Sequence, residues 1–247
     1  MTEELSLDVD AIESPEPTVI AALPGPGMVG ISANRYLEEQ IGLEETGHIQ
    51  AEGLPAITPY LEGRPYHHTR LFSKDNFVYT FLTCELPIPL QFTEPFGRKL
   101  LSWIDEQAVE EVTLLTAIPS LDDADQDLFY VASDDYRAHR LADTAVYPLA
   151  GGFLSGVNAS LLARAMDTSL RVGVLATSVN PRQPFDGSAA LRLVEGLNEI
   201  YGFDVETNEL RAFANSTEAY LEQLTAQIEA QQRTTDRRTA TEDYGFM

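Results

Sequence analysis

Leu23-Pro24-Gly25-Pro26-Gly27-Met28-Val29-Gly30 joins a short apolar run, residues 18–23, to a stretch with helical periodicity, residues 28–39. The apolar run is continuous rather than alternating, which predicts a strand buried on both faces of a sheet. The helix is expected to end near Ile41-Gly42, because glycine suits a helix C-cap. The quoted stretch is therefore a strand-to-helix turn, the basic unit of an α/β fold.

The glycines of this turn, Gly25, Gly27 and Gly30, have the G-x-G-x-x-G spacing of a dinucleotide-binding fingerprint. An acidic residue, Glu52, follows at about twenty residues, as that fingerprint requires. However, prolines flank Gly25 on both sides, and proline lacks the backbone N–H that would donate to a pyrophosphate. We favour close backbone packing as the reason for these glycines and keep cofactor binding as the weaker alternative.

A second glycine-rich turn, Gly151-Gly152-Phe153-Leu154-Ser155-Gly156, precedes a helix predicted over residues 157–166. Its candidate cofactor-binding residues are Gly151, Gly152 and Gly156. Ser155 lacks the G-x-S-x-G pattern of a nucleophile elbow, so the turn does not predict a hydrolase.

The remaining periodicity alternates between strands and helices. Further strands are predicted over residues 46–51, 71–72, 77–84, 109–117 and 170–178, and further helices over residues 94–108, 134–141, 186–201 and 215–232. The last of these helices is expected to begin at a capping pair, Asn215 and Glu218. This order predicts an α/β fold, a three-layer α/β/α sandwich around a mainly parallel sheet that includes one hairpin.

Four segments are expected along the chain. They are an acidic N-terminal segment, residues 1–17, with room for a short edge strand; the α/β domain, residues 18–214; a C-terminal helix, residues 215–232; and a flexible tail, residues 233–247.

The charge of the chain is unusual. Thirty-nine acidic residues face 16 basic ones, for a net charge of -23, and only Lys74 and Lys99 among the basic residues are lysines. An acidic, lysine-poor surface suits concentrated salt, in which charge repulsion is screened, so we expect a halophilic protein rather than an acidic mesophilic one. Since no basic stripe is present to displace phosphate counterions, a nucleic-acid partner is excluded.

Other features predict a cytoplasmic protein without a membrane segment. No run approaches the roughly 20 apolar residues that span a bilayer, and the acidic start, residues 1–5, does not resemble a signal peptide. Cys84 is the only cysteine, which excludes an intrachain disulfide, and its apolar strand predicts a small core residue.

No metal site or catalytic set is predicted. Asp123, Asp125 and Asp127 have calcium-loop spacing, but Leu128 occupies the position that requires glycine. None of the four histidines stands at zinc-ligand spacing from another ligand: His48, His67, His68 and His139.

Three stretches in a fixed order point to a known family. They are the first turn, residues 151–162, and a stretch that begins Asp186-Gly187-Ser188-Ala189-Ala190 and ends Tyr201-Gly202-Phe203-Asp204-Val205. Together they resemble the archaeal proteasome assembly chaperone family, formerly described as relatives of ATP-grasp enzymes, over residues 18–205. The resemblance implies a nucleoside-phosphorylase-like sandwich, homo-oligomers and a non-enzymatic role as a chaperone of 20S proteasome α-subunits.

The resemblance also directs attention to the C-terminal residues. In such proteins a hydrophobic-tyrosine-any tripeptide can dock between α-subunits, and the candidate partner-binding residues here are Tyr244, Phe246 and Met247. Glycine replaces the hydrophobic residue and phenylalanine the tyrosine, and the missing hydroxyl forfeits about 1 kcal/mol if it is hydrogen-bonded in the pocket.

Two functions are therefore carried forward. The first is a chaperone or adaptor that needs no cofactor and binds proteasome α-subunits through its tail. The alternative is a nucleotide- or nucleoside-binding protein or enzyme whose ligand lies at the two glycine-rich turns, because such turns follow the carboxyl ends of neighbouring strands.

Overall fold

The structure is a computed structural model that describes residues 6–11, 14–52, 54, 56–120, 127–179 and 186–215. Its main strands are β1 (Ser6–Ala11), β2 (Thr18–Ala22), β3 (Glu44–Glu52), β6 (Thr69–Ser73), β7 (Tyr79–Cys84), β8 (Glu111–Pro119), β9 (Leu128–Ala132), β10 (Tyr147–Pro148) and β11 (Arg171–Val179). A separate hairpin consists of β4 (Tyr60–Leu61) and β5 (Arg64–Pro65). The helices are η1 (Pro26–Met28), α1 (Val29–Ile41), α2 (Leu90–Glu106), α3 (Asp134–Arg140), α4 (Gly156–Ala165) and α5 (Gly187–Tyr201).

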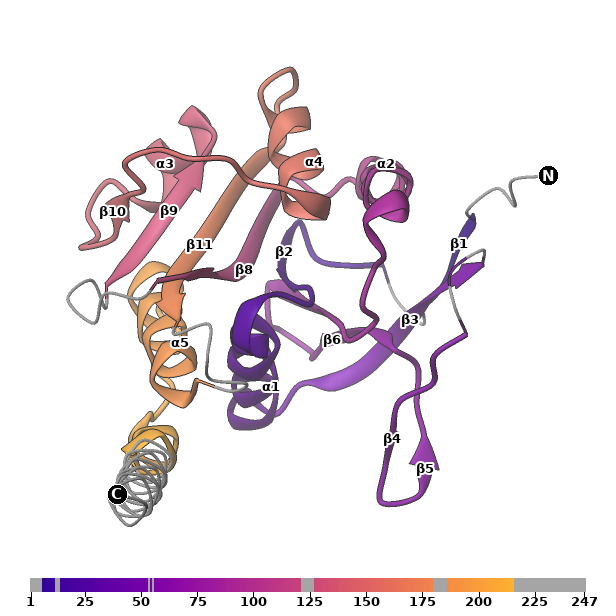
Figure 1. The fold of residues 1–247 in the computed structure, drawn as a ribbon, viewed down its shortest axis with the longest axis horizontal. Coiled ribbons are helices and arrows are strands. Elements are labelled where there is room, and N and C mark those ends of the chain that lie inside the picture. Colours follow the sequence, from indigo (N-terminus) through magenta and orange to yellow (C-terminus); the bar gives the residue numbers. More distant parts are fainter. Residues whose placement is uncertain are drawn as a thin grey trace, which may run out of the picture.

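Within the described ranges, nine strands form one mixed sheet in the order β1-β3-β6-β7-β2-β8-β11-β9-β10 (Figure 1). The four central strands, β7, β2, β8 and β11, run parallel to one another. On one side β6, β3 and β1 continue the sheet in antiparallel pairs, and on the other side β9 pairs antiparallel with β11. The predicted hairpin is confirmed as β6–β7, and β1 is an edge strand.

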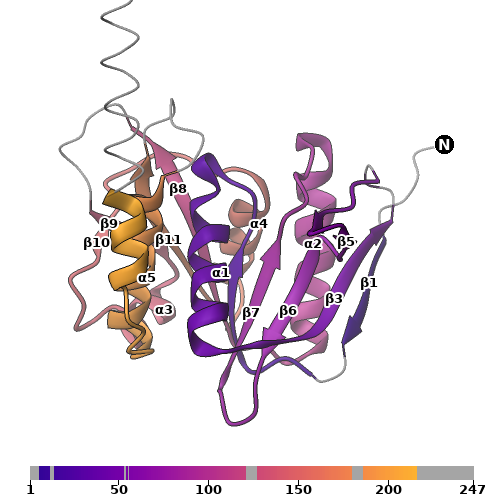
Figure 2. The same cartoon turned by 90° about the horizontal axis from the view of Figure 1, so that it is seen from below.

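Helices cover both faces of the sheet. α1 and α5 lie on one face, and α2 and α4 lie on the other (Figure 2). β2 shows why its apolar run is continuous: Ile20 and Ala22 pack in the core beneath α1 and α5, whereas Val19 and Ala21 pack in the core beneath α2 and α4. The predicted three-layer α/β/α sandwich is confirmed.

The first predicted helix is confirmed at both ends. α1 buries Val29, Ala33 and Leu37, and it ends at Gly42, whose left-handed backbone (φ 72°) donates its N–H to the carbonyl oxygens of the last turn. The helix predicted over residues 186–201 is also confirmed, as α5, with Asp186 as its N-cap.

Three predictions about secondary structure are corrected. α2 begins at Leu90 rather than residue 94, directly after Pro89. β9 was not predicted, although its five residues form a continuous apolar run. Residues 208–215 are helical, so Asn215 lies inside this helix and is not its N-cap. The rest of the predicted C-terminal helix and the tail, residues 216–247, lie outside the described residues.

Candidate functional site

The first turn forces the chain from β2 into α1 through two consecutive left-handed residues. Gly27 has φ 63° and Met28 has φ 52°, and the N–H of Met28 donates to the carbonyl oxygen of Gly25 at 3.1 Å. A left-handed backbone costs a non-glycine residue roughly 1–2 kcal/mol, so Met28 is held there by the turn around it. The chain is therefore rigid at the carboxyl end of β2.

Gly30 is the last glycine of the predicted fingerprint, and its packing against β8 explains why no side chain fits there. A Cβ atom at this position would lie 2.5 Å from the carbonyl oxygen of Leu115 in β8, which is closer than real Cβ contacts. The missing side chain thus allows α1 to lie directly on the backbone of β8. This contact confirms the expectation that the backbone packs closely at this turn.

The second turn has more space around it. Gly152 (φ 149°) and Gly156 (φ 73°) have backbones that favour glycine, and a Cβ atom at Gly151 or Gly152 would meet no atom within 4 Å. α4 begins at Gly156, as predicted, and Ser155 stands at its N-cap position without a side-chain cap bond. The ring of Phe153 is fully exposed beside it.

The two turns meet at one cleft of about 430 Å³, at the carboxyl ends of β2 and β8. Its lining residues come from both turns, the end of β8 and the start of α2: Leu23, Pro24, Gly25, Pro26, Ile88, Leu90, Thr93, Thr116, Ala117, Ile118, Pro119, Phe153, Leu154, Ser155, Gly156, Val157 and Asn158. Of the six candidate glycines, Gly25 and Gly156 line the cleft, whereas Gly27, Gly30, Gly151 and Gly152 are not among the lining residues. Hereafter we name this feature the turn cleft.

The described residues that line the turn cleft include no charged side chain. The first turns of the three helices that begin near it are also without acidic residues: α1, α2 and α4 have neither a side-chain cap bond nor an acidic residue there. In contrast, Ser133 and Asp186 cap α3 and α5. This uncharged composition stands out in a chain with 39 acidic residues.

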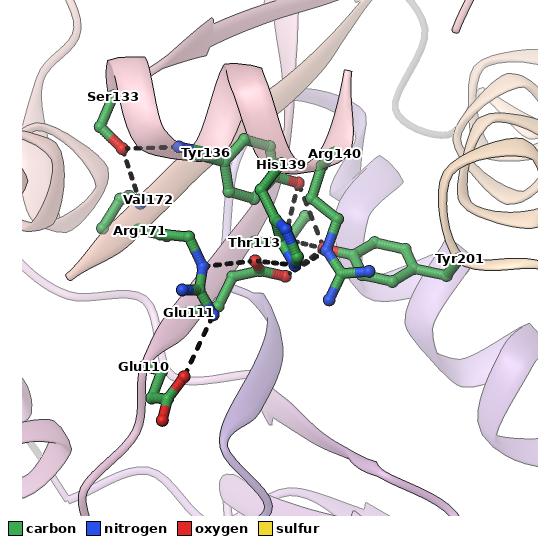
Figure 3. Close-up of polar contacts among 10 residues, drawn as sticks. All are labelled: Glu110, Glu111, Thr113, Ser133, Tyr136, His139, Arg140, Arg171, Val172 and Tyr201. Carbon is green, nitrogen blue, oxygen red and sulfur yellow. Dashed lines mark hydrogen bonds and ion pairs between the residues drawn. The ribbon is translucent and has the colours of Figure 1, made fainter. Parts of the chain in front are cut away.

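A second cluster lies at the amino end of β8, around Glu111 (Figure 3). This carboxylate is fully buried and accepts from Arg140 Nε at 2.7 Å and from Arg171 Nε at 3.0 Å. The Tyr201 hydroxyl donates to the same carboxylate at 3.4 Å, and His139 Nε2 lies 3.9 Å away. Because both oxygens are bonded and the partners come from α3, β11 and α5, the cluster ties four elements together.

Two buried tyrosines complete the Glu111 cluster. The hydroxyls of Tyr136 and Thr113 lie 2.8 Å apart, and Tyr201 hydrogen-bonds to Thr113. Burial raises the pKa of Tyr136 to about 12 and raises the pKa of Tyr201 well above its ordinary value. These phenols therefore stay protonated near neutral pH and can donate hydrogen bonds within the cluster. Sequence reasoning missed it, because its members are far apart in the chain.

The remaining candidate residues from the sequence are Cys84 and the histidines. Burial raises the pKa of the Cys84 thiol, which confirms a core residue. The rings of His48 and His67 stack at 3.5 Å, a contact that the sequence did not predict, whereas His68 Nδ1 lies 2.8 Å from Thr69 Oγ1. Among the described residues, no three histidine, cysteine, aspartate or glutamate side chains are placed to hold a metal ion.

Some predictions fall outside the described ranges. Asp123 and Asp125 of the acidic loop are among them, as are the candidate partner-binding residues Tyr244, Phe246 and Met247. In the part of the chain that the structure describes, no helix is long and apolar enough to cross a bilayer.

Comparisons with known proteins agree with this architecture. The family model described as the PAC2 family matches residues 19–225. An uncharacterized protein of Methanocaldococcus jannaschii is 25% identical over 219 residues, which cover 87% of this chain and 88% of that protein.

Two solved structures from Pyrococcus furiosus share the fold. PbaA, described as an archaeal homolog of proteasome-assembly chaperone, has a TM-score of 0.76 and 23% identity over 97% of this chain and 99% of its own. PbaB, described as an archaeal proteasome activator, has a TM-score of 0.75 and 16% identity over 91% of this chain and 100% of its own.

Proposed function

The chain belongs to the PAC2 family, and on that basis we propose that it is a non-enzymatic chaperone or adaptor that acts on the proteasome by binding 20S α-subunits. One observation carries this proposal: the family model spans most of the sandwich, residues 19–225. The fold shared with PbaA and PbaB is consistent with it, since both of those proteins are described in terms of the proteasome.

The contact with α-subunits is assigned to Tyr244, Phe246 and Met247. An aromatic and a thioether side chain provide apolar area for a pocket between two subunits. Before this segment the structure describes helix 208–215, which buries Leu210 and Ala214 against the domain. Polar contacts add to this attachment. Tyr36 Oη donates to the carbonyl oxygen of Glu206 at 2.8 Å, and Arg211 forms an ion pair with Glu195.

The proposed setting is the cytoplasm of a halophile, with the protein as a homo-oligomer. The net charge of -23 supports the first part, because copies of so acidic a chain repel one another strongly unless salt screens them. Salt that allows copies to associate would equally allow the chain to approach a proteasome subunit.

Co-purification in molar potassium chloride tests the proposal. The intact chain, a form that lacks Phe246 and Met247, and Thr241→Ala as a control are each mixed with α-subunits. The intact chain and the control are expected to retain α-subunits, and the shortened form is expected to lose them. If the intact chain retains none, the proposed function is wrong; if the shortened form binds equally well, the assignment of the contact is wrong.

Phe246→Tyr sharpens the same test. A tyrosine hydroxyl that finds a hydrogen-bond partner in the pocket contributes about 1 kcal/mol, so this variant is expected to bind about fivefold more tightly. Equal affinity of Phe246→Tyr and the parent chain would contradict docking of this ring in a tyrosine pocket.

A further inference from the structure

We propose that the turn cleft is a binding site for a small, uncharged organic molecule with a flat apolar body and oxygen atoms that accept hydrogen bonds. This inference goes beyond the chaperone role and does not depend on it. It rests on the position of the cleft in the sheet, its walls, the spare hydrogen-bonding capacity of three lining side chains and the absence of charge among the lining residues that the structure describes.

The position is the one that ligands occupy in open α/β sheets. β2 and β8 are parallel neighbours, but the chain leaves them in opposite directions: after β2 it continues through α1 toward β3, and after β8 it continues toward β9 on the other side. Such a reversal leaves a crevice outside the carboxyl ends of the two strands, and ligands of α/β proteins bind in such crevices. The turn cleft lies at this point.

The walls suit an apolar molecule of moderate size. A volume of about 430 Å³ lies within the range of roughly 300–1,000 Å³ that is typical of small-molecule sites. Ile88, Ala117 and Leu154 contribute apolar surface, while Leu90 and Phe153 are strongly exposed. An exposed phenyl ring beside a cleft offers a face on which a flat ligand can stack.

Three polar side chains in the cleft have spare hydrogen-bonding capacity. Thr116, Ser155 and Asn158 line it, and none of them forms a side-chain hydrogen bond with another described residue. Thr93 differs, because its hydroxyl already donates to the carbonyl oxygen of Leu90 at 2.8 Å. A few polar groups among apolar walls are what orients a small ligand.

The charge of the lining side chains indicates which chemical class of ligand the cleft suits. A phosphate or carboxylate is bound most firmly by arginine or lysine, and the described lining residues include neither. Pro24 and Pro26 also remove two backbone N–H groups that a phosphate would use. The hydroxyls of Thr116 and Ser155 and the amide of Asn158 can instead donate to a carbonyl or hydroxyl oxygen. The side chains that the structure describes in the cleft thus favour an uncharged ligand over a phosphate, which revises the phosphate reading of the first turn.

Matched pairs of probes test this assignment on the full chain in molar potassium chloride. The pairs are benzamide with benzoate, nicotinamide with nicotinate, and adenosine with AMP, in each of which one member is uncharged and the other is an anion. Calorimetric titration is expected to show that at least one uncharged member binds, with a dissociation constant at least tenfold below that of its anionic partner.

Two variants locate the binding. Ser155→Trp places an indole at the exposed edge of the cleft and is expected to weaken binding at least tenfold. The control, Ser102→Trp, changes an exposed residue of α2 that does not line the cleft and is expected to keep the dissociation constant within twofold. Thr116→Val removes a hydroxyl at nearly constant shape and is expected to weaken binding about threefold or more.

Three results would overturn the proposal: no uncharged probe binds, an anion binds as tightly as its uncharged partner, or Ser155→Trp leaves affinity unchanged. Retention of α-subunits is measured on the same variants. Since Ser155→Trp is expected to retain them, loss of the ligand site and loss of the chaperone role produce different results.

Discussion

The two ends of β8 differ in the charge and the hydrogen bonding of the side chains around them. At its amino end, the buried carboxylate of Glu111 is held by Arg140 and Arg171, which come from α3 and β11. At its carboxyl end, Thr116 lines a cleft in which it, Ser155 and Asn158 form no side-chain hydrogen bond with another described residue and no described lining side chain is charged. One strand thus carries the buried Glu111 cluster at one end and the turn cleft at the other.

The difference shows where charge serves stability in this acidic chain. A buried carboxylate is tolerated only if its oxygens are hydrogen-bonded and its charge is balanced, and Glu111 has both kinds of support from its own chain. The turn cleft needs no such support, because the lining residues that the structure describes there are uncharged. We therefore expect substitutions at the amino end to alter folding and substitutions at the carboxyl end to alter binding.

Glu111→Ala is expected to have the largest effect. It leaves two partly buried guanidinium groups without their carboxylate, and breaking a buried ion pair in this way costs about 3–5 kcal/mol. Urea unfolding at constant high salt measures the loss. The control is Glu110→Gln, whose exposed carboxylate pairs with Arg171 at the surface and is expected to change stability by less than about 1 kcal/mol. Similar losses of unfolding free energy in both variants would contradict the contrast between the buried ion pairs of Glu111 and the surface pair of Glu110.

Glu38→Gln tests a buried carboxyl group that lacks the guanidinium hydrogen bonds of Glu111. Burial raises the pKa of Glu38 to about 7 from 4.5, although the Thr83 hydroxyl donates to it at 2.6 Å. The folded state therefore keeps a proton that the unfolded chain releases, and the free energy of unfolding falls as the pH rises from about 4.5 to about 7.

The variant should remove this fall and raise stability above pH 7 by an amount on the order of 2 kcal/mol. Urea unfolding at several pH values checks it. An unchanged pH profile in Glu38→Gln would show that another group titrates in this window.

Gly30→Ala tests the close contact between the first turn and β8. The added Cβ atom would meet the Leu115 carbonyl oxygen at 2.5 Å, and overpacking against backbone costs about 1–3 kcal/mol. Gly151→Ala is the control from the second turn, where a Cβ atom meets nothing within 4 Å, and it should leave stability within about 0.5 kcal/mol. Thermal unfolding compares the two, and equal midpoints would argue against the contact.

Thr116→Val should have the smallest effect on folding. The Thr116 hydroxyl has no hydrogen-bond partner among the described residues, so its removal is expected to change stability by less than about 0.5 kcal/mol while it weakens binding in the turn cleft. A large loss of stability would place the hydroxyl in a structural role and would make the two ends of β8 more alike.

Much of the fold could be predicted from local patterns. The continuous apolar run of β2, the buried stripe of α1 and the terminating Gly42 each depend on residues within a few positions of one another. The prediction missed the short apolar run of β9, and it missed the first turn of α2, which lies outside the apolar stripe of that helix.

The candidate site could be predicted only in part. Both glycine-rich turns were recognised, yet of their six glycines only Gly25 and Gly156 line the turn cleft, while Gly30 serves packing. The first and second turns lie more than a hundred residues apart, so no local pattern could show that they share one cleft.

The sequence by itself determined the α/β class, the strand-to-helix turns and the acidic character of the chain, because backbone preference, periodicity and charge are properties of short segments. The tertiary structure alone decided that Glu111 meets Arg140 and Arg171, and that the two turns meet at one cleft whose described lining side chains carry no charge. Such contacts join residues far apart in the chain, and their partners are set by strand order and by the packing of helices on the sheet.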